Sequence, residues 1–511
     1  MDAARAGGGA SGKPGVATLR PDAPIRSGRL AGLTMWQAIF VLSWPILVES
    51  FMASLVGFVD TLLSAAISVA ATDAIGGASY IMWFLNLIGL ALGVGATAMI
   101  SRAIGKGRRA VADATTGQTM LLAFTLGAVV AAIVFALAPE ISRMLQLEGE
   151  AQESFIVYLR ICALGVPALG VFGSGAACCR GAGDSLRPLI IMVIVNAVNI
   201  VVSWVLCGVD IAVSRMDETG EFVSRTIIAN PFGFDMGIRG IAIGTLTAWI
   251  AGGLIVLWWL VRGSSGVRLK KSRLKPHWIT MRRLIRVGLP NFIETFGMWF
   301  GNFLILLFVG WMAAPGLLGA HIVAIRVEAF SFLPGFAMGL AAATLAGQYI
   351  GAGAPHLARI AILRCTAIAA GLMGLFGVAF MLFPNKIVGL FSQQPEHMEL
   401  APPIIFIAGM VQIPFAIMLV LRTGMRGAGD TKVAMILTWT ATYGIRLPLA
   451  YALCGVDIIL PGWLGGGVIV NPFPFDYGLY GLWIGLCLEI VIRAMLFGGR
   501  FLHGGWSRVK V

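Results

Sequence analysis

Long runs of apolar residues alternate with short polar segments along almost the whole chain. An apolar run of about 20 residues is long enough for a helix to cross the hydrocarbon core of a membrane, which is roughly 30 Å thick. Twelve runs reach that length, near residues 38–66, 75–103, 114–138, 155–179, 186–207, 238–261, 284–312, 320–350, 360–383, 403–424, 433–454 and 478–499. We therefore predict an all-α integral membrane protein with 12 transmembrane helices.

Composition supports this prediction. Of the 511 residues 58% are hydrophobic and only 12% are charged, with a mean hydropathy of +0.88. A soluble domain has about a quarter of its residues charged. The net charge of +13 would suggest nucleic acid in a soluble chain. Here Lys and Arg concentrate in the tails and loops on one side of the spans. This bias predicts a multi-pass protein of the inner (cytoplasmic) membrane with both termini in the cytoplasm and no nucleic-acid partner.

The second half of the chain repeats the first. The pentapeptide RGAGD occurs at Arg180–Asp184 and again at Arg426–Asp430. Three further pairs of segments match: LSWPILVES with VGLPNFIET, which aligns Pro45 and Glu49 with Pro290 and Glu294; CGVDI at 207–211 with 454–458; and NPFGFDMGIRG at 230–240 with NPFPFDYGLYG at 471–481. Six spans are thus followed by six more on the same plan. The paired outer loops at 208–237 and 455–477 carry no chemistry that the sequence identifies.

We predict two pseudo-symmetric six-helix lobes, at 38–261 and 284–500, joined by a basic cytoplasmic linker at 262–283. Residues 1–37 and 501–511 are predicted to be cytoplasmic tails, the first of them flexible. Each lobe has an even number of spans, so both lobes enter the membrane from the same side, as parallel repeats do. Two such lobes enclose a central cleft, which suits a carrier that works by alternating access.

Each RGAGD copy is interpreted as a hinge-like turn between two spans. Glycine permits a tight turn, the aspartate can cap the next helix, and the arginine suits the lipid headgroup region. The residues of the two turns are Arg180, Gly181, Gly183, Asp184, Arg426, Gly427, Gly429 and Asp430.

Several ionisable residues lie inside the predicted spans, where a charge is expensive and is by default a functional candidate. Glu49 and Glu294 occupy equivalent positions, which suggests a shared role in each lobe. We expect most of the others to neutralise one another structurally. They are Arg326, Glu328 and Arg446 as one group, and Glu489 with Arg493 as an i, i+4 pair.

Asp60 is the acid that the repeat does not duplicate, because Ile305 is its counterpart. No cation is evident near it in the first lobe. We interpret Asp60 as a group that exchanges protons or coordinates Na⁺, with a structural acid as the alternative. The polar residues expected around it are Asn86 on the second span and Asn196, Asn199 and Ser203 on the fifth.

These segments together resemble the multidrug and toxic compound extrusion (MATE) family over nearly all of residues 35–500. The carriers are GFVDT in the first span, RGAGD after the fourth and tenth, NAVNI in the fifth, and AHIVAIRVEAFSFLPGFAMGLAAATLAGQYIGAG in the eighth. The resemblance implies an exporter that exchanges organic cations for inward H⁺ or Na⁺. It places Asp60 on the family's first-span acid and Asn199 on its fifth-span asparagine.

The chain departs from the family at three positions. Ser203 stands where the family often has an acid, and Met298 and Phe415 stand where the NorM-like branch has acids. The chain therefore resembles the DinF-like branch more closely, with coupling in the first lobe. Because a hard cation prefers anionic oxygen ligands, the serine favours H⁺ over Na⁺ at Asp60.

Other classes of protein remain as alternatives. A lipid-linked oligosaccharide or polysaccharide flippase of the wider superfamily is the nearest, and a membrane-embedded enzyme is remote. The seven cysteines and five histidines form no metal or catalytic motif. We expect no enzyme activity, no cofactor beyond the coupling ion and no metal other than Na⁺. The expected partners are small organic molecules and the lipid bilayer, and the expected state is a monomer.

Overall fold

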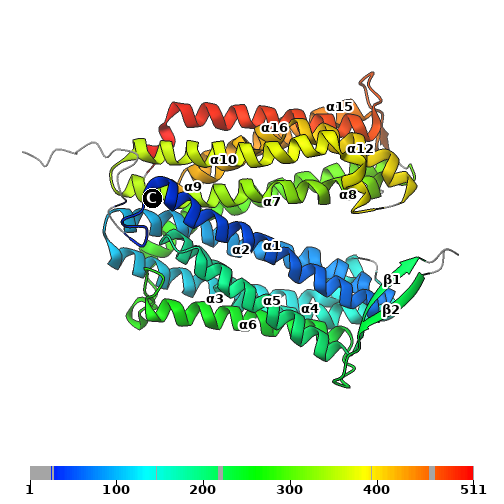
Figure 1. Ribbon diagram of the computed structural model, residues 1–511, viewed down its shortest axis with the longest axis horizontal. Helices are drawn as coiled ribbons and strands as arrows, with labels where there is room; N and C mark the ends of the chain where they lie inside the picture. Colours follow the sequence, from blue (N-terminus) through cyan, green and yellow to red (C-terminus); the bar gives the residue numbers. More distant parts are fainter. Residues whose placement is uncertain are drawn as a thin grey trace, which may run out of the picture.

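The computed structural model describes residues 25, 28–145, 147–216, 222–312, 314–392, 394–459 and 467–509. Long helices lie side by side in two groups, coloured blue to green and green to red along the chain (Figure 1). The start of α1 and the C-terminus lie at the same end of the bundle, and the β1–β2 hairpin lies at the other.

The first lobe is a bundle of six helices. They are α1 (Met35–Ile67), α2 (Val69–Gly105), α3 (Arg109–Met144), α4 (Gly149–Gly181), α5 (Leu186–Cys207) and α6 (Ile238–Arg262). α4 lies at the centre and packs against α2, α3 and α6. α1 begins with a capping box, in which the Thr34 hydroxyl accepts from the Gln37 backbone and the Gln37 side chain accepts from Thr34.

The second lobe has the same plan but is more interrupted. Its helices are α7 (Trp278–Trp311), α8 (Leu317–Ser331), α9 (Leu333–Gly351), α10 (Pro355–Leu382), α11 (Pro384–Gly389), α12 (Pro395–Met410), α13 (Gln412–Gly427), α14 (Thr431–Ala441), α15 (Leu447–Cys454) and α16 (Gly478–His503). A π-helical turn, η2 (Thr442–Arg446), joins α14 to α15. Short 3₁₀ turns, η1 (Lys271–Arg273) and η4 (Gly505–Arg508), precede α7 and follow α16.

Two predicted spans of the second lobe are bent pairs of helices. α8 and α9 meet at 44°, and α12 and α13 meet at 58°. Pro334 and Pro414 lie just after the two breaks, where a residue without a backbone N–H leaves the helix ladder incomplete. Pro45, Pro167 and Pro290 lie within unbroken helices, so proline alone does not determine the bend.

The helices account for the predicted number of membrane crossings. Within the described ranges nine helices are long and apolar enough to cross a membrane, and each of the two bent pairs can supply one more. α14, η2 and α15 together cover the remaining predicted span, 433–454. The prediction of an all-α membrane protein with two pseudo-symmetric lobes is confirmed.

The paired outer loops contain small hairpins. β1 (Ile211–Met216) pairs antiparallel with β2 (Phe222–Ile228), and β3 (Ile458–Ile459) pairs with β4 (Val468–Ile469). The repeated CGVDI and NPF segments hold each hairpin at its base. Asp210 accepts from the backbone of Asn230 at 2.7 Å, and Asp457 accepts from the backbone of Asn471 at 2.7 Å. Residues 217–221 and 460–466 of these loops lie outside the described residues.

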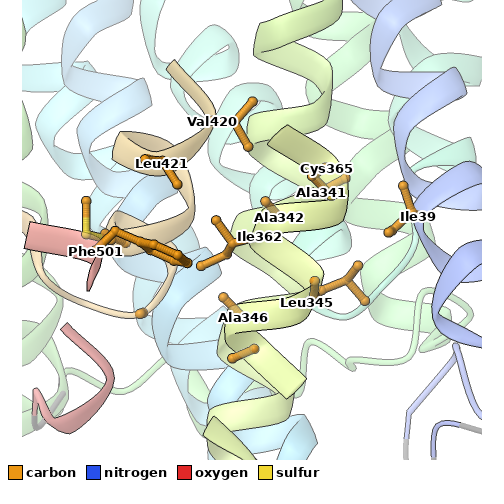
Figure 2. Packing of buried hydrophobic residues seen from close by; sticks show 14 of the residues in the cluster. Ile39, Ala341, Ala342, Leu345, Ala346, Ile362, Cys365, Val420, Leu421 and Phe501 are labelled. Atoms are coloured by element: carbon orange, nitrogen blue, oxygen red, sulfur yellow. The ribbon is translucent and has the colours of Figure 1, made fainter. Parts of the chain in front are cut away.

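The segments predicted as tails contribute to the packing where they are described. Leu30 and Met35 are buried within an apolar cluster formed by α9, α10 and α13 of the second lobe. Figure 2 shows Ile39 of α1 close to Leu345 and Ala341 in the same cluster. At the other terminus Trp506 is buried in this cluster as well. The chain therefore packs against the second lobe before residue 38 is reached. Residues 1–24, 26 and 27 of the predicted flexible tail lie outside the described residues.

Candidate functional site

Asp60 lies in a buried polar pocket formed by four helices of the first lobe. α1 carries the carboxylate, which is 4% exposed. Thr245 of α6 donates to Oδ2 at 2.9 Å and Tyr158 of α4 donates to the same oxygen at 3.4 Å. Asn199 of α5 donates to Oδ1 at 3.3 Å. All three donors are uncharged, so the pocket holds one acid solvated by hydroxyl and amide groups.

Close packing of α5 on α6 brings these donors together. Asn199 and Ser203 lie four residues apart and therefore share one face of α5. Gly244 of α6 lies directly against Ser203, because a Cβ atom at Gly244 would collide with the serine side chain. The next residue, Thr245, then reaches both Asp60 and Asn199, the second at 3.1 Å. A larger residue at position 244 would separate the two helices and open the pocket.

The predicted neighbours of Asp60 do not all reach it. Asn199 contacts the acid directly. Ser203 does not bond to Asp60, but its hydroxyl oxygen accepts from the Asn199 amide at 3.5 Å. Asn196 instead donates to the backbone of its own helix at Met192. Asn86 is exposed and faces apolar residues of α3 and α4. Neither Asn86 nor Asn196 bonds to Asp60 in the described structure, so of the four polar residues expected around the acid only Asn199 contacts it and Ser203 lies next to that asparagine.

Tyr158 and Thr245 were not predicted from the sequence. Each is a single polar residue within an otherwise apolar span, and such residues commonly bond to their own helix backbone. A weak signal is present for Thr245, since it follows Gly244 at the point where a small residue lets α6 approach α5.

No cation balances Asp60. Within the described parts of the chain no lysine, arginine or histidine forms an ion pair with it, and no group of three His, Cys, Asp or Glu residues could hold a metal ion. The Oδ1 atom of Asn199, in the same pocket, is buried without a hydrogen-bond partner. The carboxylate and this amide oxygen are therefore both acceptors that a proton or a small cation would satisfy.

The equivalent place in the second lobe has different chemistry. Ile305 stands where Asp60 stands in the repeat, and it is 3% exposed within an apolar cluster. The polar residues of the second lobe lie instead around Glu489 of α16. Arg493 donates to this glutamate at 2.5 Å and Arg446 donates to it at 3.1 Å. A carboxylate held only by neutral donors is therefore not repeated at the equivalent position of the second lobe.

The predicted neutralisation of in-span charges is partly right. Glu489 and Arg493 form the expected i, i+4 ion pair. Arg446, however, pairs with Glu489 rather than with Glu328. Arg326 is exposed on α8, and no ion pair joins it to Glu328 in the described structure. Arg446 still interacts electrostatically with Glu328. The expected group is therefore present only in part, because Arg326 lies outside it and α16 supplies the carboxylate that pairs directly with Arg446.

The RGAGD arginines face inward and pair with the repeated glutamates. Arg180 at the end of α4 donates to Glu49 of α1 at 2.8 Å. Arg426 at the end of α13 donates to Glu294 of α7 at 3.1 Å. The same ion pair is therefore present in both lobes, between residues that the repeat aligns. The interpretation of these arginines as headgroup contacts is wrong, because each forms an ion pair with a carboxylate on the first helix of its own lobe.

The rest of each RGAGD copy forms the predicted tight turn. Gly183 and Gly429 have φ angles of +91° and +90°, the left-handed region that favours glycine. The two turns include Gly181 and Gly427, at which a Cβ atom would press on α2 and α9 respectively.

The two aspartates of the turns form ion pairs. Asp184 accepts from the Arg187 backbone at 3.4 Å and also pairs with the Arg187 side chain. Asp430 pairs with Arg500 at 2.9 Å and makes no cap bond. The capping role is therefore present only in the first copy.

The lobes contact each other at the end of the bundle where the RGAGD turns lie, which we call the turn end. Arg102 of α2 donates to the carbonyl of Ala428 in the second turn at 2.6 Å, and to that of Val509 at 2.7 Å. Thr344 of α9 donates to the carbonyl of Arg180 in the first turn at 3.2 Å. Each lobe thus reaches the turn of the other, and these contacts close the turn end.

Two repeated helical lobes, closed against each other at one end and differing in their buried charges, define a multi-pass membrane transporter. The chain belongs to the MatE family, whose model matches residues 45–205 and 290–452, one segment in each lobe. The further assignment to the DinF-like branch stays a prediction.

Curated relatives match along nearly their whole length. The chain is 28% identical to the "Probable multidrug resistance protein NorM" of Thermotoga maritima over 476 residues, which are 92% of this chain and 93% of the relative. It is 25% identical to the "Multidrug resistance protein PmpM" of Pseudomonas aeruginosa over 470 residues, 90% of this chain and 92% of the relative.

A solved structure described as the outward-facing conformation of a multidrug resistance MATE family transporter of the MOP superfamily has the same fold. It matches with a TM-score of 0.78 at 20% identity, over 93% of this chain and 97% of that chain.

Proposed function

We propose that this protein is a secondary-active multidrug efflux antiporter. It exports organic amphiphilic compounds in exchange for inward H⁺ or Na⁺ by alternating access between its two lobes. Family membership and the names of the relatives support export of small organic molecules. The single observation that carries the coupling mechanism is Asp60, buried at 4% exposure with three neutral donors and no cation.

A buried carboxylate without a cation is costly to keep ionised, and binding of H⁺ or Na⁺ removes that cost. The ion therefore binds when the pocket is open to the side of higher ion concentration. The neutral pocket is then stable during the conformational change, whereas the empty charged pocket is not. This difference is what couples the ion to the movement of the lobes. Of the two ions H⁺ needs fewer anionic ligands, and Asp60 is the only carboxylate that the described pocket offers.

The orientation that we propose places the turn end in the cytoplasm. The basic linker around η1 and the RGAGD turns lie in the loops that the positive-inside rule assigns to that side. The contacts of Arg102 and Thr344 close this side in the structure. Substrate loading from the cytoplasm then requires that these contacts break, and the exit side lies towards the β hairpins.

Reconstituted vesicles test the proposal. A cationic dye is loaded, and its movement is followed when a proton gradient or a sodium gradient of equal size is imposed separately. We expect the proton gradient to drive saturable transport and the Asp60→Asn variant to lose it while still inserting and purifying normally. Asp73→Asn is the matched control, because it removes an exposed carboxylate of α2 in the same lobe and leaves the pocket intact.

Full transport by Asp60→Asn would contradict the coupling role. Flux that does not saturate and needs no ion gradient would indicate a channel instead.

A further inference from the structure

Four arginines gather inside the second lobe, and we call them the arginine cluster. They are Arg422 and Arg426 of α13, Arg446 of η2 and Arg493 of α16. In the described structure their only ion-pair partners are two carboxylates, Glu294 and Glu489. A buried excess of positive charge needs a partner of opposite charge to be stable. Glu328 also interacts electrostatically with Arg446. Even with this third carboxylate, the four arginines carry more positive charge than the described acids around them balance.

The partners are unequally shared. Arg426 donates to Glu294 at 3.1 Å, and Thr438 donates to the same glutamate at 2.6 Å. Arg422 is left with a distant contact, since its Nη1 lies 3.8 Å from Glu294. Its Nε has no hydrogen-bond partner although the residue is only 8% exposed. A guanidinium has five N–H donors and no acceptor, so Arg422 is the under-partnered member of the cluster.

Two of the guanidiniums converge on a thioether. The Nη1 atoms of Arg422 and Arg493 lie 3.7 and 3.9 Å from the sulfur of Met298 on α7. Thioether sulfur is a weak acceptor, whereas a carboxylate, sulfonate or phosphate makes short, charge-assisted hydrogen bonds to arginine. The position between these two Nη1 atoms thus has the donors of an anion site, and the protein fills it with a weak acceptor.

The site has partly exposed members and apolar side chains beside it. The side chains of Arg422 and Arg446 are 10% and 12% exposed. Met298 is half-buried. The next residue on α7, Trp299, packs against Trp83 of the first lobe, with ring centroids 3.7 Å apart and ring planes tilted by 50°. An anion attached to an apolar body would place its charge at the arginines and its body on these rings.

We propose that Arg422, Arg493 and the surface around Met298 form a binding site for the anionic group of an amphiphilic ligand. This inference rests on the proposed function and narrows it, because the substrates then include zwitterionic and anionic amphiphiles rather than cations alone. The shared chemistry is a carboxylate, sulfonate or phosphate on an apolar body, whether a soluble compound or a lipid supplies it.

Binding of two matched dyes tests the site. A rhodamine with a free carboxylate and its methyl ester differ only in the anionic group. Each is titrated by fluorescence anisotropy against the purified protein in nanodiscs of phosphatidylcholine. We expect the carboxylate dye to bind about tenfold more tightly, which is the effect of one charge-assisted hydrogen bond. Equal affinities for the two dyes would overturn the proposal.

Variants locate the effect. Arg422→Gln should remove the preference by weakening only the carboxylate dye. Met298→Glu should also remove it, because the new carboxylate occupies the position between the arginines. Met298→Gln has the same shape without the charge and should retain the preference. Loss of affinity for both dyes alike in Arg422→Gln, or an unchanged preference in Met298→Glu, would contradict the site.

The source of the anion is distinguished by adding phosphatidylglycerol to the nanodiscs. Competition with the carboxylate dye in the natural protein but not in Met298→Glu identifies a lipid headgroup as an occupant, and no competition assigns the site to soluble amphiphiles. The vesicle assay separates this inference from the proposed function. If the protein prefers the carboxylate dye but shows no gradient-driven dye transport, the anion site stands and the antiporter proposal fails. If it transports dye but shows no preference, the antiporter proposal stands and the anion site fails.

Discussion

Arg102 of α2 holds the second-lobe turn through the carbonyl of Ala428, at a distance of 2.6 Å. The arginine belongs to one lobe and the carbonyl to the other, so this hydrogen bond exists only while the turn end is closed. A second bond from the same side chain to Val509, at 2.7 Å, ties in the segment after α16. The relationship makes Arg102 a direct probe of the conformational equilibrium between the lobes.

Loss of the Arg102 side chain should favour the state that is open at the turn end. A charge-assisted hydrogen bond contributes about 1.5–3 kcal/mol, so Arg102→Ala should shift the equilibrium by about tenfold or more. Spin labels on α3 and α10 at this end, read by pulsed electron resonance, would report a larger distance.

Lys106→Ala is the matched control for Arg102→Ala, because Lys106 is an exposed cation one turn further along. All seven natural cysteines are buried, which keeps background labelling low. An unchanged distance distribution in Arg102→Ala would show that other contacts hold the turn end closed.

Loss of either hydroxyl donor to Asp60 should reduce transport, and the shorter hydrogen bond should have the larger effect. Thr245→Val removes a 2.9 Å hydrogen bond and should reduce gradient-driven dye transport strongly. Tyr158→Phe removes a 3.4 Å contact and should have a smaller effect. Initial rates in vesicles, compared at several pH values, measure the order. An effect of Tyr158→Phe that exceeds that of Thr245→Val would count against the pocket geometry.

A second carboxylate in the pocket should change the ion that drives transport. Ser203 lies 3.5 Å from Asn199, which itself contacts Asp60. Ser203→Asp therefore adds anionic oxygen beside the existing acid, and Na⁺ binds best to such ligands. We expect a sodium gradient to drive transport in this variant more strongly than in the natural protein. Ser203→Asn adds similar volume without charge, so a sodium gradient should not increase its transport. Equal stimulation of the two variants by sodium would show that the added carboxylate is not the cause.

The repeated glutamates should differ in their contribution to stability. Glu294 is fully buried and interacts with Arg426, Arg422 and Thr438. The Glu49 side chain is 12% exposed and interacts with Arg180. Breaking a buried ion pair leaves an uncompensated charge and costs roughly 3–5 kcal/mol.

Glu294→Gln should therefore lower the thermal unfolding temperature of the purified protein more than Glu49→Gln does. The double variant Glu49→Gln with Arg180→Gln should recover part of the smaller loss, because it removes both charges. Equal destabilisation by the two single variants would mean that the environments of the two glutamates are energetically alike.

The fold was largely predictable from the sequence because membrane crossings depend on local apolar length. The duplication was predictable because short motifs recur in register between the two halves of the chain. The same register singled out Glu49 and Glu294. The bends beside Pro334 and Pro414 were not, because Pro290 lies in an unbroken helix with the same local chemistry. Tertiary packing, which the local sequence does not contain, separates these cases.

The candidate site was only partly predictable. Asp60 stands out as an unduplicated acid in a span, and Asn199 shares its pocket as expected. Thr245 lies 185 residues away from Asp60 in the chain, and only the packing of α6 on α5 brings them together. Arg422 lies near the end of a predicted span, where a basic residue usually reaches out to the headgroups. Its burial beside Glu294 follows from the fold and not from its position in the sequence.

The ion pair between an RGAGD arginine and the first helix is kept in both lobes, while the polar centres of the lobes have become different. An ancestral duplication with this outcome has separated two inherited tasks. Substitutions around Met298 alter the second lobe and leave the Asp60 pocket untouched, so variation in the compounds recognised need not disturb the ion that drives export. If both proposed sites are correct, the compound bound and the ion that drives export are set in different lobes of the same chain, and substitutions in one lobe can change the first without changing the second.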